Sequence, residues 1–304
     1  MDPLEKINFS KDSTIAVIRH LQENAKIKLI IPDSVSYDSC NVTADICDVK
    51  IKSVAKRDYL QSRSSKINLN KLDCIFFRKD PPVDNKYITD LQIFRELEYQ
   101  NTLVLNSPQS LLQFNEKLLG NQLSISKIPT LVTSNVNRVH SFLKTHNTVV
   151  LKPMNMMGGQ GILKINKSRQ SKAIIQEYIN QYKIIIVQKF LDEIKNGDNR
   201  IIIYNGIIEE NVLTRYPPEG DFIANLSNGG KFKINKLKKK YHTQLQNVAS
   251  FLKYHGIFFA GVDMIGDHIT EINFTSPTGV QQIKSGLSKK IASELLSTVK
   301  NYLL

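Results

Sequence analysis

The sequence predicts an α/β protein, and three observations lead to this prediction. Strand-like apolar runs alternate with helix-like segments along the chain. The 304 residues have 41% hydrophobic content, which is enough to bury a sizeable core in two domains, or in one domain with a lid. Later strands pair closely across short turns that contain glycine. We therefore expect alternating strands and helices early in the chain and strand hairpins later.

The part of the chain before about residue 112 has strand-like segments separated by helix-like ones, as in a small parallel sheet. No internal repeat or low-complexity linker interrupts this pattern. The expected strands are 27–32, 74–79 and 102–106, and the expected helices are 13–24 and 86–100.

The later part of the chain contains two predicted hairpins. Residues 148–153 and 161–165 are expected to form two strands joined by a glycine-bearing loop. Residues 257–265 and 269–274 are expected to form a second hairpin, which turns at the dipeptide 266–267, Gly-Asp.

The last segment, 288–304, is predicted to be an amphipathic helix. Ile291, Leu295, Val299 and Leu303 recur at i, i+4 spacing, so they form one apolar stripe that would face a core. Further expected elements are the strands 184–190 and 199–206 and the helix 137–146.

The composition argues against several classes of protein. No apolar run approaches the length of a membrane span, and the polar first segment lacks the apolar core of a signal peptide, so we expect a cytosolic protein. Cys40, Cys47 and Cys74 are odd in number and lack zinc-site spacing, so ordinary reduced thiols are expected. The six His residues include no HxxxH pair, and zinc-dependent hydrolysis therefore has no support.

The net charge of +13 is a second compositional feature, and it raises the question of nucleic-acid binding. Lys, Asn and Ile are used heavily throughout, as an AT-rich genome would produce, and this general bias weakens any argument from charge. Only residues 231–240 form a dense run, which we interpret as the solvated start of a helix. A diffuse positive field would also suit an anionic substrate such as ATP.

The second predicted hairpin carries three oxygen-bearing side chains. Asp263 lies on its first strand, and Glu271 and Asn273 lie at i and i+2 on its second strand, on one face. The turn can bring Asp263 close to the other two. Magnesium prefers oxygen ligands and commonly shares them with substrate phosphates, so this set could hold two ions bridged by a nucleotide. Taken alone, the same residues could also be the solvent-facing side of an amphipathic hairpin.

The loop of the first predicted hairpin, residues 155–161, contains three glycines that would let backbone N–H groups approach an anion closely. It is not a P-loop, because no Gly-Lys-Ser/Thr follows, and no helix opens after it as in a dinucleotide fingerprint. A plain flexible turn is the alternative. Lys152, immediately before the loop, favours a triphosphate site.

Two further segments are weaker candidates for nucleotide contacts. Lys117 lies on a helix, where a single lysine is usually a solvated surface charge. Residues 187–191 follow a hydrophobic strand, and their backbone could bond an adenine edge while Phe190 and Leu191 cover the ring.

Two arginines and a long loop complete the candidates. Arg200 and Arg215 lie after turn-like or strand segments, and a guanidinium can bind a carboxylate or phosphate as a fork. Residues 217–230 are rich in Gly, Pro and Asn, which is typical of a mobile lid and also of an ordinary long connection.

Taken in order, these pieces resemble the ATP-grasp superfamily and, more narrowly, the bacterial glutathione synthetases. The resemblance covers nearly the whole chain. RKDPP, NSPQSL with NEKL, and INFTSPTG are its most specific parts, whereas the magnesium and glycine-loop blocks occur in many ATP-grasp ligases. The matching blocks are FFRKDPP (76–82), NSPQSLLQFNEKL (106–118), LKPMNMMGGQGI (151–162), VQKFL (187–191), GDNRIIIYNG (197–206), TRYPP (214–218), NLSNGG (225–230) and GVDMIGDHITEINFTSPTG (261–279).

The resemblance implies a fold and a reaction. Residues 1–112 would form a Rossmann-like pre-ATP-grasp domain, and 113–304 the ATP-grasp domain, with a lid at about 120–190 and a mobile loop at about 217–230. ATP would phosphorylate the cysteinyl carboxylate of γ-glutamylcysteine, and glycine would attack the acyl phosphate to give glutathione, ADP and phosphate. Because this transfer brings anionic oxygens together, it needs metal ions and cationic side chains.

The resemblance also implies a role for each candidate residue. Two Mg²⁺ or Mn²⁺ ions would accompany ATP and be bound by Asp263, Glu271 and Asn273. Arg200 and Arg215 would be the catalytic residues, and Arg200 would stabilise the transferring phosphoryl group and the acyl phosphate. Both arginines would also help to bind the peptide substrates. The residues expected at ATP are Lys117, Lys152, Met157, Gly158, Gly159, Gly161, Gln188, Lys189, Phe190 and Leu191, and those expected at the peptide substrates are Asp2, Lys11, Asp12, Ser276, Pro277 and Thr278.

Three features depart from the family pattern. Members usually have an apolar strand before the segment that matches residues 1–3, so the N-terminal unit is expected to lack its first, central strand. Ile223 and Gln281 stand where the family carries arginine. Because neither side chain supplies a charge, the identity of the peptide substrates is less secure than the ATP chemistry.

Two other readings stay open from the sequence. Another ATP-grasp ligase, of the glutamate-adding or D-alanine-adding type, is the nearer one, but RKDPP and NSPQSL favour a glutathione synthetase. A non-catalytic nucleic-acid-binding protein would cluster basic residues and exposed aromatics on one face, whereas the lysines here are dispersed. The expected partners are ATP, γ-glutamylcysteine and glycine, without nucleic acid or membrane, in a homo-oligomer that is usually a tetramer in the family.

Overall fold

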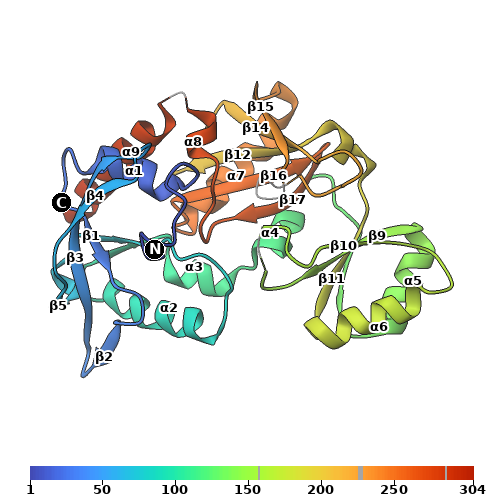
Figure 1. Cartoon of the computed structure of the whole chain (residues 1–304), viewed down its shortest axis with the longest axis horizontal. Coiled ribbons are helices and arrows are strands. Elements are labelled where there is room, and N and C mark those ends of the chain that lie inside the picture. The colour runs from blue at the N-terminus through green and yellow to red at the C-terminus, as the bar shows by residue number, and fades with distance from the viewer. Residues whose placement is uncertain (157, 225–228, 285) are drawn as a thin grey trace.

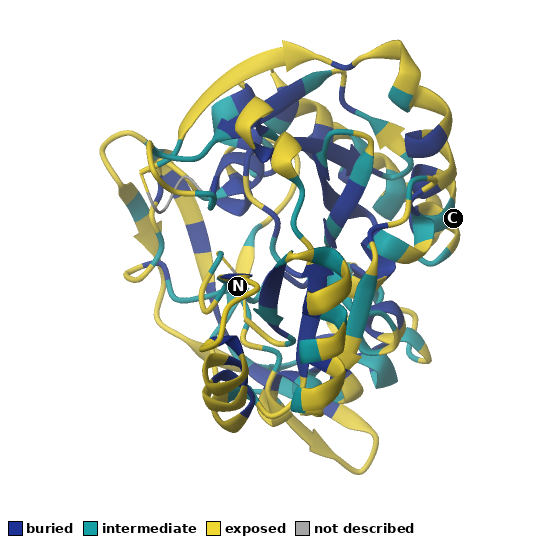
Figure 2. Ribbon diagram, turned by 90° about the vertical axis from the view of Figure 1, so that its right-hand side faces the viewer, coloured by how far each residue is buried: buried dark blue, intermediate teal, exposed yellow. Residues whose placement is uncertain are grey.

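The computed structural model describes residues 1–156, 158–224, 229–284 and 286–304, and it has the mixed α/β architecture that the sequence predicts (Figure 1). Within these ranges the strands form a five-stranded and a two-stranded N-terminal sheet, a four-stranded sheet and a six-stranded sheet. Buried positions are concentrated in the inner strands, and exposed positions lie on the outer helices, on connecting turns and on some outer strands (Figure 2).

The N-terminal region is mainly antiparallel, so the small parallel sheet predicted there is wrong except for one strand pair. Strand β3 (Asn41–Ser53) pairs antiparallel with four others, and only β6 (Cys74–Phe76) and β7 (Leu103–Leu105) pair in parallel. The partners of β3 are β1 (Lys28–Ile30), β2 (Ser36–Asp38), β4 (Asp58–Gln61) and β5 (Ser65–Asn68).

Strands β2 to β5 were missed because their apolar pattern is short and irregular. Buried positions alternate from Val42 to Ile46 along β3, but Cys47 is buried as well, and the alternation then continues in the opposite phase to Ile51. This change of phase lets β3 contribute to two separate clusters of buried side chains. A single two-residue period therefore does not describe the strand.

Both helices predicted in this region are present with shorter ends. Helix α1 (Ser13–Leu21) begins after Asp12, whose carboxylate accepts a hydrogen bond from the Ile15 N–H at 2.7 Å. Helix α2 (Asn85–Glu98) is capped in the same way by Asp84.

The four-stranded sheet has its own core and lies beside the rest of the molecule (Figure 1). Helices α5 (Val136–His146) and α6 (Ser171–Tyr182) pack on it through Val139, Leu143 and Ile175. The predicted glycine loop joins the antiparallel pair β9–β10. The strands, in spatial order, are β10 (Leu163–Asn166), β9 (Thr148–Pro153), β11 (Ile185–Lys189) and β8 (Thr130–Thr133).

The six-stranded sheet is covered on both faces. Along β12 (Asp198–Tyr204), Ile201 and Ile203 face one cluster of apolar residues, and Ile202 and Tyr204 face another. The first cluster includes residues of α4 (Glu116–Leu123) and α7 (His242–Tyr254), and the second includes residues of α8 (Val280–Ile283) and α9 (Leu287–Leu303). The other strands are β13 (Ile207–Ile208), β14 (Asn211–Tyr216), β15 (Lys231–Lys236), β16 (Phe259–Ile265) and β17 (His268–Asn273).

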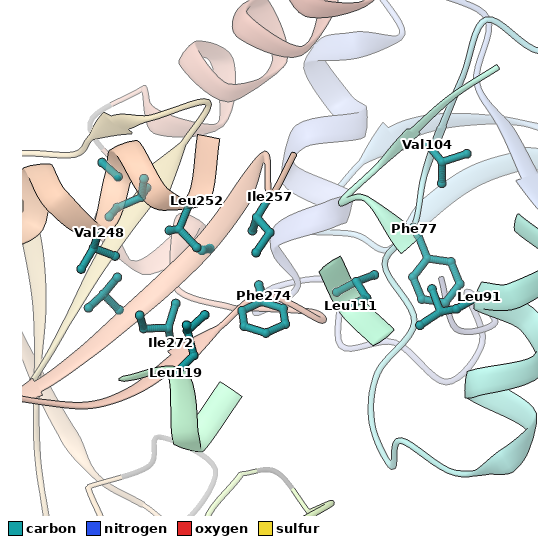
Figure 3. Packing of buried hydrophobic residues seen from close by; sticks show 14 of the residues in the cluster. Phe77, Leu91, Val104, Leu111, Leu119, Val248, Leu252, Ile257, Ile272 and Phe274 are labelled. Carbon is teal, nitrogen blue, oxygen red and sulfur yellow. The ribbon is translucent and has the colours of Figure 1, made fainter. Parts of the chain in front are cut away.

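One hydrophobic core joins the N-terminal region to the six-stranded sheet. It runs from Phe77 and Leu91 to Ile272 and Phe274, with Leu111 of the short helix α3 (Pro108–Gln113) between them (Figure 3). Such continuous burial fixes the relative position of the two parts, because separating them would expose apolar surface at about 25 cal/mol per Å².

The amphipathic C-terminal helix is confirmed as α9. Ile291 and Leu295 of the predicted stripe are buried, and Val299 packs partly against the same cluster. Leu303, at the last turn, is 54% exposed, so the stripe ends before it.

The basic run 231–240 is a strand followed by a 3₁₀ turn, and the predicted helix start is wrong. Residues Lys231–Lys236 form the exposed edge strand β15, whose one strand partner among the described residues is β14, and α7 begins at His242. In KFKINK, polar residues alternate with Phe232 and Ile234, a two-residue period that favours a strand. Lysines on an edge strand stay solvated and discourage pairing with another chain.

A cavity of about 790 Å³ lies between two strand edges of the N-terminal region. It is lined by residues of β1, β6, α1 and α9, and within the described residues each of the two strands pairs on one side only. The lack of a first strand in this unit and the division at residue 112 stay predictions.

In the part of the chain that the structure describes, no helix combines the length and apolarity needed to cross a membrane.

The three cysteines are free, as predicted, and differ in environment. Burial, with a smaller contribution from Asp73, raises the pKa of Cys74 to about 12, whereas Cys40 is exposed. An acid with a raised pKa stays protonated until the pH approaches that value, so only about one Cys74 thiol in ten thousand is ionised at pH 8.

Alkylation by iodoacetamide, followed by mass spectrometry, tests this difference. We expect rapid labelling of Cys40 at pH 8 and negligible labelling of Cys74, with all three thiols reacting in urea. Equal rates at Cys40 and Cys74 in the folded protein would contradict the structure.

Candidate active site

A cavity of about 400 Å³ brings together residues of both large sheets and of the N-terminal region. Lys152 and Gln188 come from the four-stranded sheet, Arg200 and Asp263 from the six-stranded sheet, and Lys11 from the segment before α1. Predicted site residues that are far apart in the sequence thus lie around one cavity.

The hairpin that carries Asp263, Glu271 and Asn273 has the predicted form. Strands β16 and β17 turn between Ile265 and His268, and Asp263 lies directly opposite Glu271 in the register. Asn273 is opposite Gly261, and its Nδ2 donates a hydrogen bond to Asp263 Oδ2 at 3.0 Å. The three side chains predicted to converge therefore do so, and all line the cavity.

Asp263 is bound by two arginines. Arg200 Nε and Nη2 donate to its two carboxylate oxygens at 2.8 and 2.7 Å, and Arg215 Nη2 lies 3.0 Å from Oδ2. Burial alone would raise the pKa of Asp263, but the two guanidiniums outweigh it and lower the pKa to about 2. The carboxylate is consequently ionised throughout the range in which the protein would work.

Asp198 is a member of this network that the sequence analysis missed. It lies opposite Arg215 in the β12–β14 pair, bonds its guanidinium, and is two residues from Arg200 on the same face of β12. Burial raises the pKa of Asp198 to about 6. The i, i+2 spacing of Asp198 and Arg200 was the signal that could have revealed it, because it sets opposite charges side by side.

Two lysines of the predicted site, from outside the six-stranded sheet, lie near the β16–β17 hairpin. Lys117 Nζ lies 3.4 Å from Glu271 Oε1 and donates to the Met156 carbonyl at 2.8 Å. Lys152 lines the cavity, and burial lowers its pKa. A Cβ on Gly120 would lie 2.9 Å from the Glu271 Cα, so the absence of a side chain there lets α4 bring Lys117 to Glu271.

The predicted adenine-binding segment lies along the same cavity. Gln188, Lys189, Phe190 and Leu191 all line it. Gln188 is buried and donates to Thr130 Oγ1 at 3.1 Å, which holds the strand end in place. The arrangement offers strand-end backbone groups beside apolar side chains, which suits a flat aromatic base.

The glycine loop is only partly at the cavity. Gly158 and Gly159 line it with positive φ values of 66° and 80°, a conformation that glycine adopts without steric cost. Gly161 instead has a packing role, because its carbonyl accepts a bond from Tyr178 Oη and a Cβ there would meet Tyr182 Oη at 2.7 Å. Met157 lies outside the described residues.

The residues predicted to bind the peptide substrates divide into two groups. Lys11, Ser276, Pro277 and Thr278 line the cavity. The other two do not line it: Asp2 Oδ2 accepts from the Asp80 N–H at 3.0 Å, and Asp12 caps α1, as described above.

The two positions that depart from the family pattern also differ. Ile223 lines the cavity, so its lack of charge bears directly on what binds there. Gln281 is not among the lining residues, and its Nε2 donates to the carbonyls of Phe9 and Asp12 at 2.5 and 2.7 Å. Gln281 therefore stabilises the segment that carries Lys11 through two hydrogen bonds and does not line the cavity.

Besides Asp198, two charged lining residues, Asp80 and Glu116, were not predicted individually. They lie within the RKDPP and NEKL blocks, so the signal was present, but their charges could not be placed without the fold. Glu116 is considered further below.

The donor set fits a magnesium ion that shares its coordination with phosphate oxygens. Asp263, Glu271 and Asn273 offer two carboxylates and one amide oxygen on one wall of the cavity, and hard oxygen ligands are what Mg²⁺ requires. Among the described residues no three His, Cys, Asp or Glu side chains are grouped as a complete metal site.

Solved structures with the same fold include ATP-grasp ligases and amino-acid ligases. D-alanyl-alanine synthetase A from Vibrio cholerae has a TM-score of 0.63 over 97% of this chain and 93% of its own, at 13% identity. An ATP-grasp ligase from Chryseobacterium gregarium has a TM-score of 0.61 over 96% and 94%, at 14% identity. These likenesses establish that the chain shares the fold of these ligases.

The particular family follows from the sequence relatives. The prokaryotic glutathione synthetase family matches through its N-terminal domain at residues 1–111 and its ATP-grasp domain at residues 116–287. Glutathione synthetase from Wigglesworthia glossinidia brevipalpis is 33% identical over all of this chain and 96% of its own length, and that from Pseudomonas aeruginosa is 32% identical over 98% and 95%. The chain belongs to the prokaryotic glutathione synthetase family.

Replacing Asp263 by Asn tests the ionic network. The change removes the charge that Arg200 and Arg215 share, and breaking a buried ion pair from one side costs about 3 kcal/mol or more. Urea unfolding should show a loss of that order. Asp267→Asn, which removes an exposed partner of Lys240, is the control and should change little; equal effects of the two changes would argue against the network.

Proposed function

We propose that this protein joins glycine to γ-glutamylcysteine at the expense of ATP, giving glutathione, ADP and phosphate. The observation that carries the proposal is the convergence of Asp263, Glu271 and Asn273 with Lys152 and Arg200 around one cavity, in a chain of the prokaryotic glutathione synthetase family. The two carboxylates and the amide suit Mg²⁺ or Mn²⁺, and the cations suit a triphosphate.

The proposed nucleotide site lies between the two large sheets. Lys152 and Lys117 would neutralise the phosphates, and the N–H groups of Gly158 and Gly159 would approach them closely. The segment 188–191 would hold the adenine. Two metal ions held by the hairpin would supply positive charge to the phosphate oxygens during transfer.

The first chemical step is transfer of the γ-phosphoryl group of ATP to the cysteinyl carboxylate, with ADP as the leaving group. The Arg200 guanidinium presents Nη1 within 3.4 Å of the Thr278 carbonyl, at the wall where the loop 276–278 lies. It is thus placed to stabilise the charge that develops on the transferred group and on the acyl phosphate.

In the second step the free amine of glycine attacks the acyl carbon, phosphate leaves, and the amine loses its proton. Ser276, Thr278 and Lys11 lie at the end of the cavity where the N-terminal region meets the sheet, and we assign the peptide substrates to this end. Phe222 and Ile223 also line the cavity, and their apolar side chains would help to keep water from the acyl phosphate. A cytoplasmic location and a homo-oligomer belong to this proposal as well.

A two-substrate assay of ADP release tests the proposed reaction. ADP release should require γ-glutamylcysteine and glycine together. A chelator of divalent metal ions should abolish it, because those ions would neutralise the ATP phosphates beside the hairpin. Glutamate- and D-alanine-containing pairs serve as alternatives. Release that occurs only with one of those pairs would overturn the assignment in favour of another ATP-grasp ligase.

Replacing Glu271 by Gln tests the role of the hairpin. The amide keeps the size of the side chain but removes the charge that attracts both the metal and Lys117, so kcat should fall by about a hundredfold or more. Glu193→Gln, at an exposed position, is the matched control and should keep wild-type turnover. Full activity of Glu271→Gln would remove Glu271 from the metal site.

A further inference from the structure

The loop between β17 and α8, residues 274–279, is held from two sides by charged side chains to which the proposed reaction gives no role. These are Glu116, from the start of α4, and Arg78, which follows β6. The loop carries Ser276 and Thr278 into the cavity. What fixes its backbone therefore fixes where the substrate-facing groups lie.

Glu116 holds the first part of the loop. Its Oε1 accepts hydrogen bonds from the N–H groups of Phe274 and Thr275 at 2.6 and 2.7 Å. Bonds to an ionised acceptor are roughly twice as strong as neutral ones, and two donors that share one oxygen fix the direction of the chain. Phe274 is also part of the shared core, so the loop begins from a buried point.

Arg78 holds the second part of the loop and connects it to the N-terminal region. Its side chain is 2% exposed, with Nη2 donating to the Pro277 carbonyl at 2.8 Å and Nε donating to Thr14 Oγ1 at 3.1 Å. The guanidinium lies 4.8 Å from the Phe259 ring centroid, a cation–π contact. Burial lowers the pKa of Arg78 to about 10, so it keeps its charge at neutral pH.

A role in stability alone accounts poorly for Arg78. A buried arginine loses hydration, and its Nη1 has no hydrogen-bond partner among the described residues. Apolar residues of similar volume often stabilise a core at least as well as buried ions do. An apolar side chain could not donate hydrogen bonds to both the Pro277 carbonyl and Thr14. These two bonds connect the loop to the start of α1.

We propose that Arg78 and Glu116 are positioning residues that hold the loop 274–279 in the form that binds the peptide carboxylate substrate. Neither needs to touch that substrate, because both act through the backbone beside Ser276 and Thr278. Among the described residues, the contacts of Arg78 include none with the segment 188–191 or the glycine loop. Its loss should therefore weaken peptide binding and spare nucleotide binding. The assignment of the substrate rests on the proposed function.

The test compares Arg78→Met and Glu116→Gln with the wild type in three measurements: KM for γ-glutamylcysteine, ADP affinity by calorimetry, and the free energy of unfolding. We expect KM for γ-glutamylcysteine to rise about tenfold in Arg78→Met, with ADP affinity within about twofold of wild type. Glu116→Gln keeps an acceptor without its charge, so we expect the same direction and a smaller rise.

Glu209→Gln is the matched control. Glu209 is also a buried carboxylate that accepts a backbone N–H, from Asn211 at 3.1 Å, and it pairs with Lys290 of α9 away from the cavity. This variant should lose stability without a change in KM. A KM for γ-glutamylcysteine that does not move in Arg78→Met, or that moves together with ADP affinity, would overturn the proposal.

One further variant and one further measurement keep the test decisive. If Arg78→Met does not fold, Arg78→Lys replaces it, because a lysine can keep the charge but cannot serve both acceptors in the same geometry. Amide exchange of Phe274 and Thr275 reports on the loop without any substrate, and it should be faster in the Arg78 and Glu116 variants than in Glu209→Gln. Unchanged exchange in the Arg78 and Glu116 variants would refute the proposal that these residues hold the loop 274–279. An inactive wild type, with exchange in the variants as expected, would refute only the assigned reaction.

Discussion

The ion pair between Asp263 and Arg200 is the interaction on which the candidate site depends. It joins the neighbouring strands β12 and β16 at one register pair of the six-stranded sheet. Arg215 extends the network to a third strand, β14, and pairs there with Asp198 of β12. Four charges of alternating sign on one face satisfy one another in a poorly hydrated place, where a single unpaired charge would be expensive to bury. The low pKa of Asp263 follows from this arrangement and keeps a carboxylate beside Glu271 and Asn273.

The network would not form a site without the packing around it. The core shared by the N-terminal region and the sheet fixes β17, and the glycine at position 120 lets α4 approach closely enough for Lys117 to reach Glu271. The four-stranded sheet has a separate core and contributes Lys152 and Gln188 from the other wall. Rigid support on one side and a separately packed unit on the other suit a reaction that must admit ATP and then exclude water.

Much of the site could be predicted because its signals are local. The Gly-Asp turn and the i, i+2 spacing of Glu271 and Asn273 were enough to place three side chains on one hairpin. The antiparallel strands β2 to β5 could not be predicted in the same way, because the burial pattern of β3 changes phase at Cys47. The lysine-rich run at 231–240 was misread because its composition concealed a two-residue alternation.

By itself, the sequence determined the α/β class, the ATP-grasp blocks and the meeting of Asp263, Glu271 and Asn273 on one hairpin, since each is encoded within a few neighbouring residues or in the order of motifs. Only the tertiary structure decided that both arginines are committed to Asp263, that Asp198 completes their network, that Gln281 faces the backbone of the segment before α1, and that Arg78 and Glu116 grip one loop. The physical reason is the short range of these interactions. Hydrogen bonds and ion pairs act over a few ångströms, and residues as distant in sequence as Arg78 and Pro277 come within that distance only when the shared core has formed.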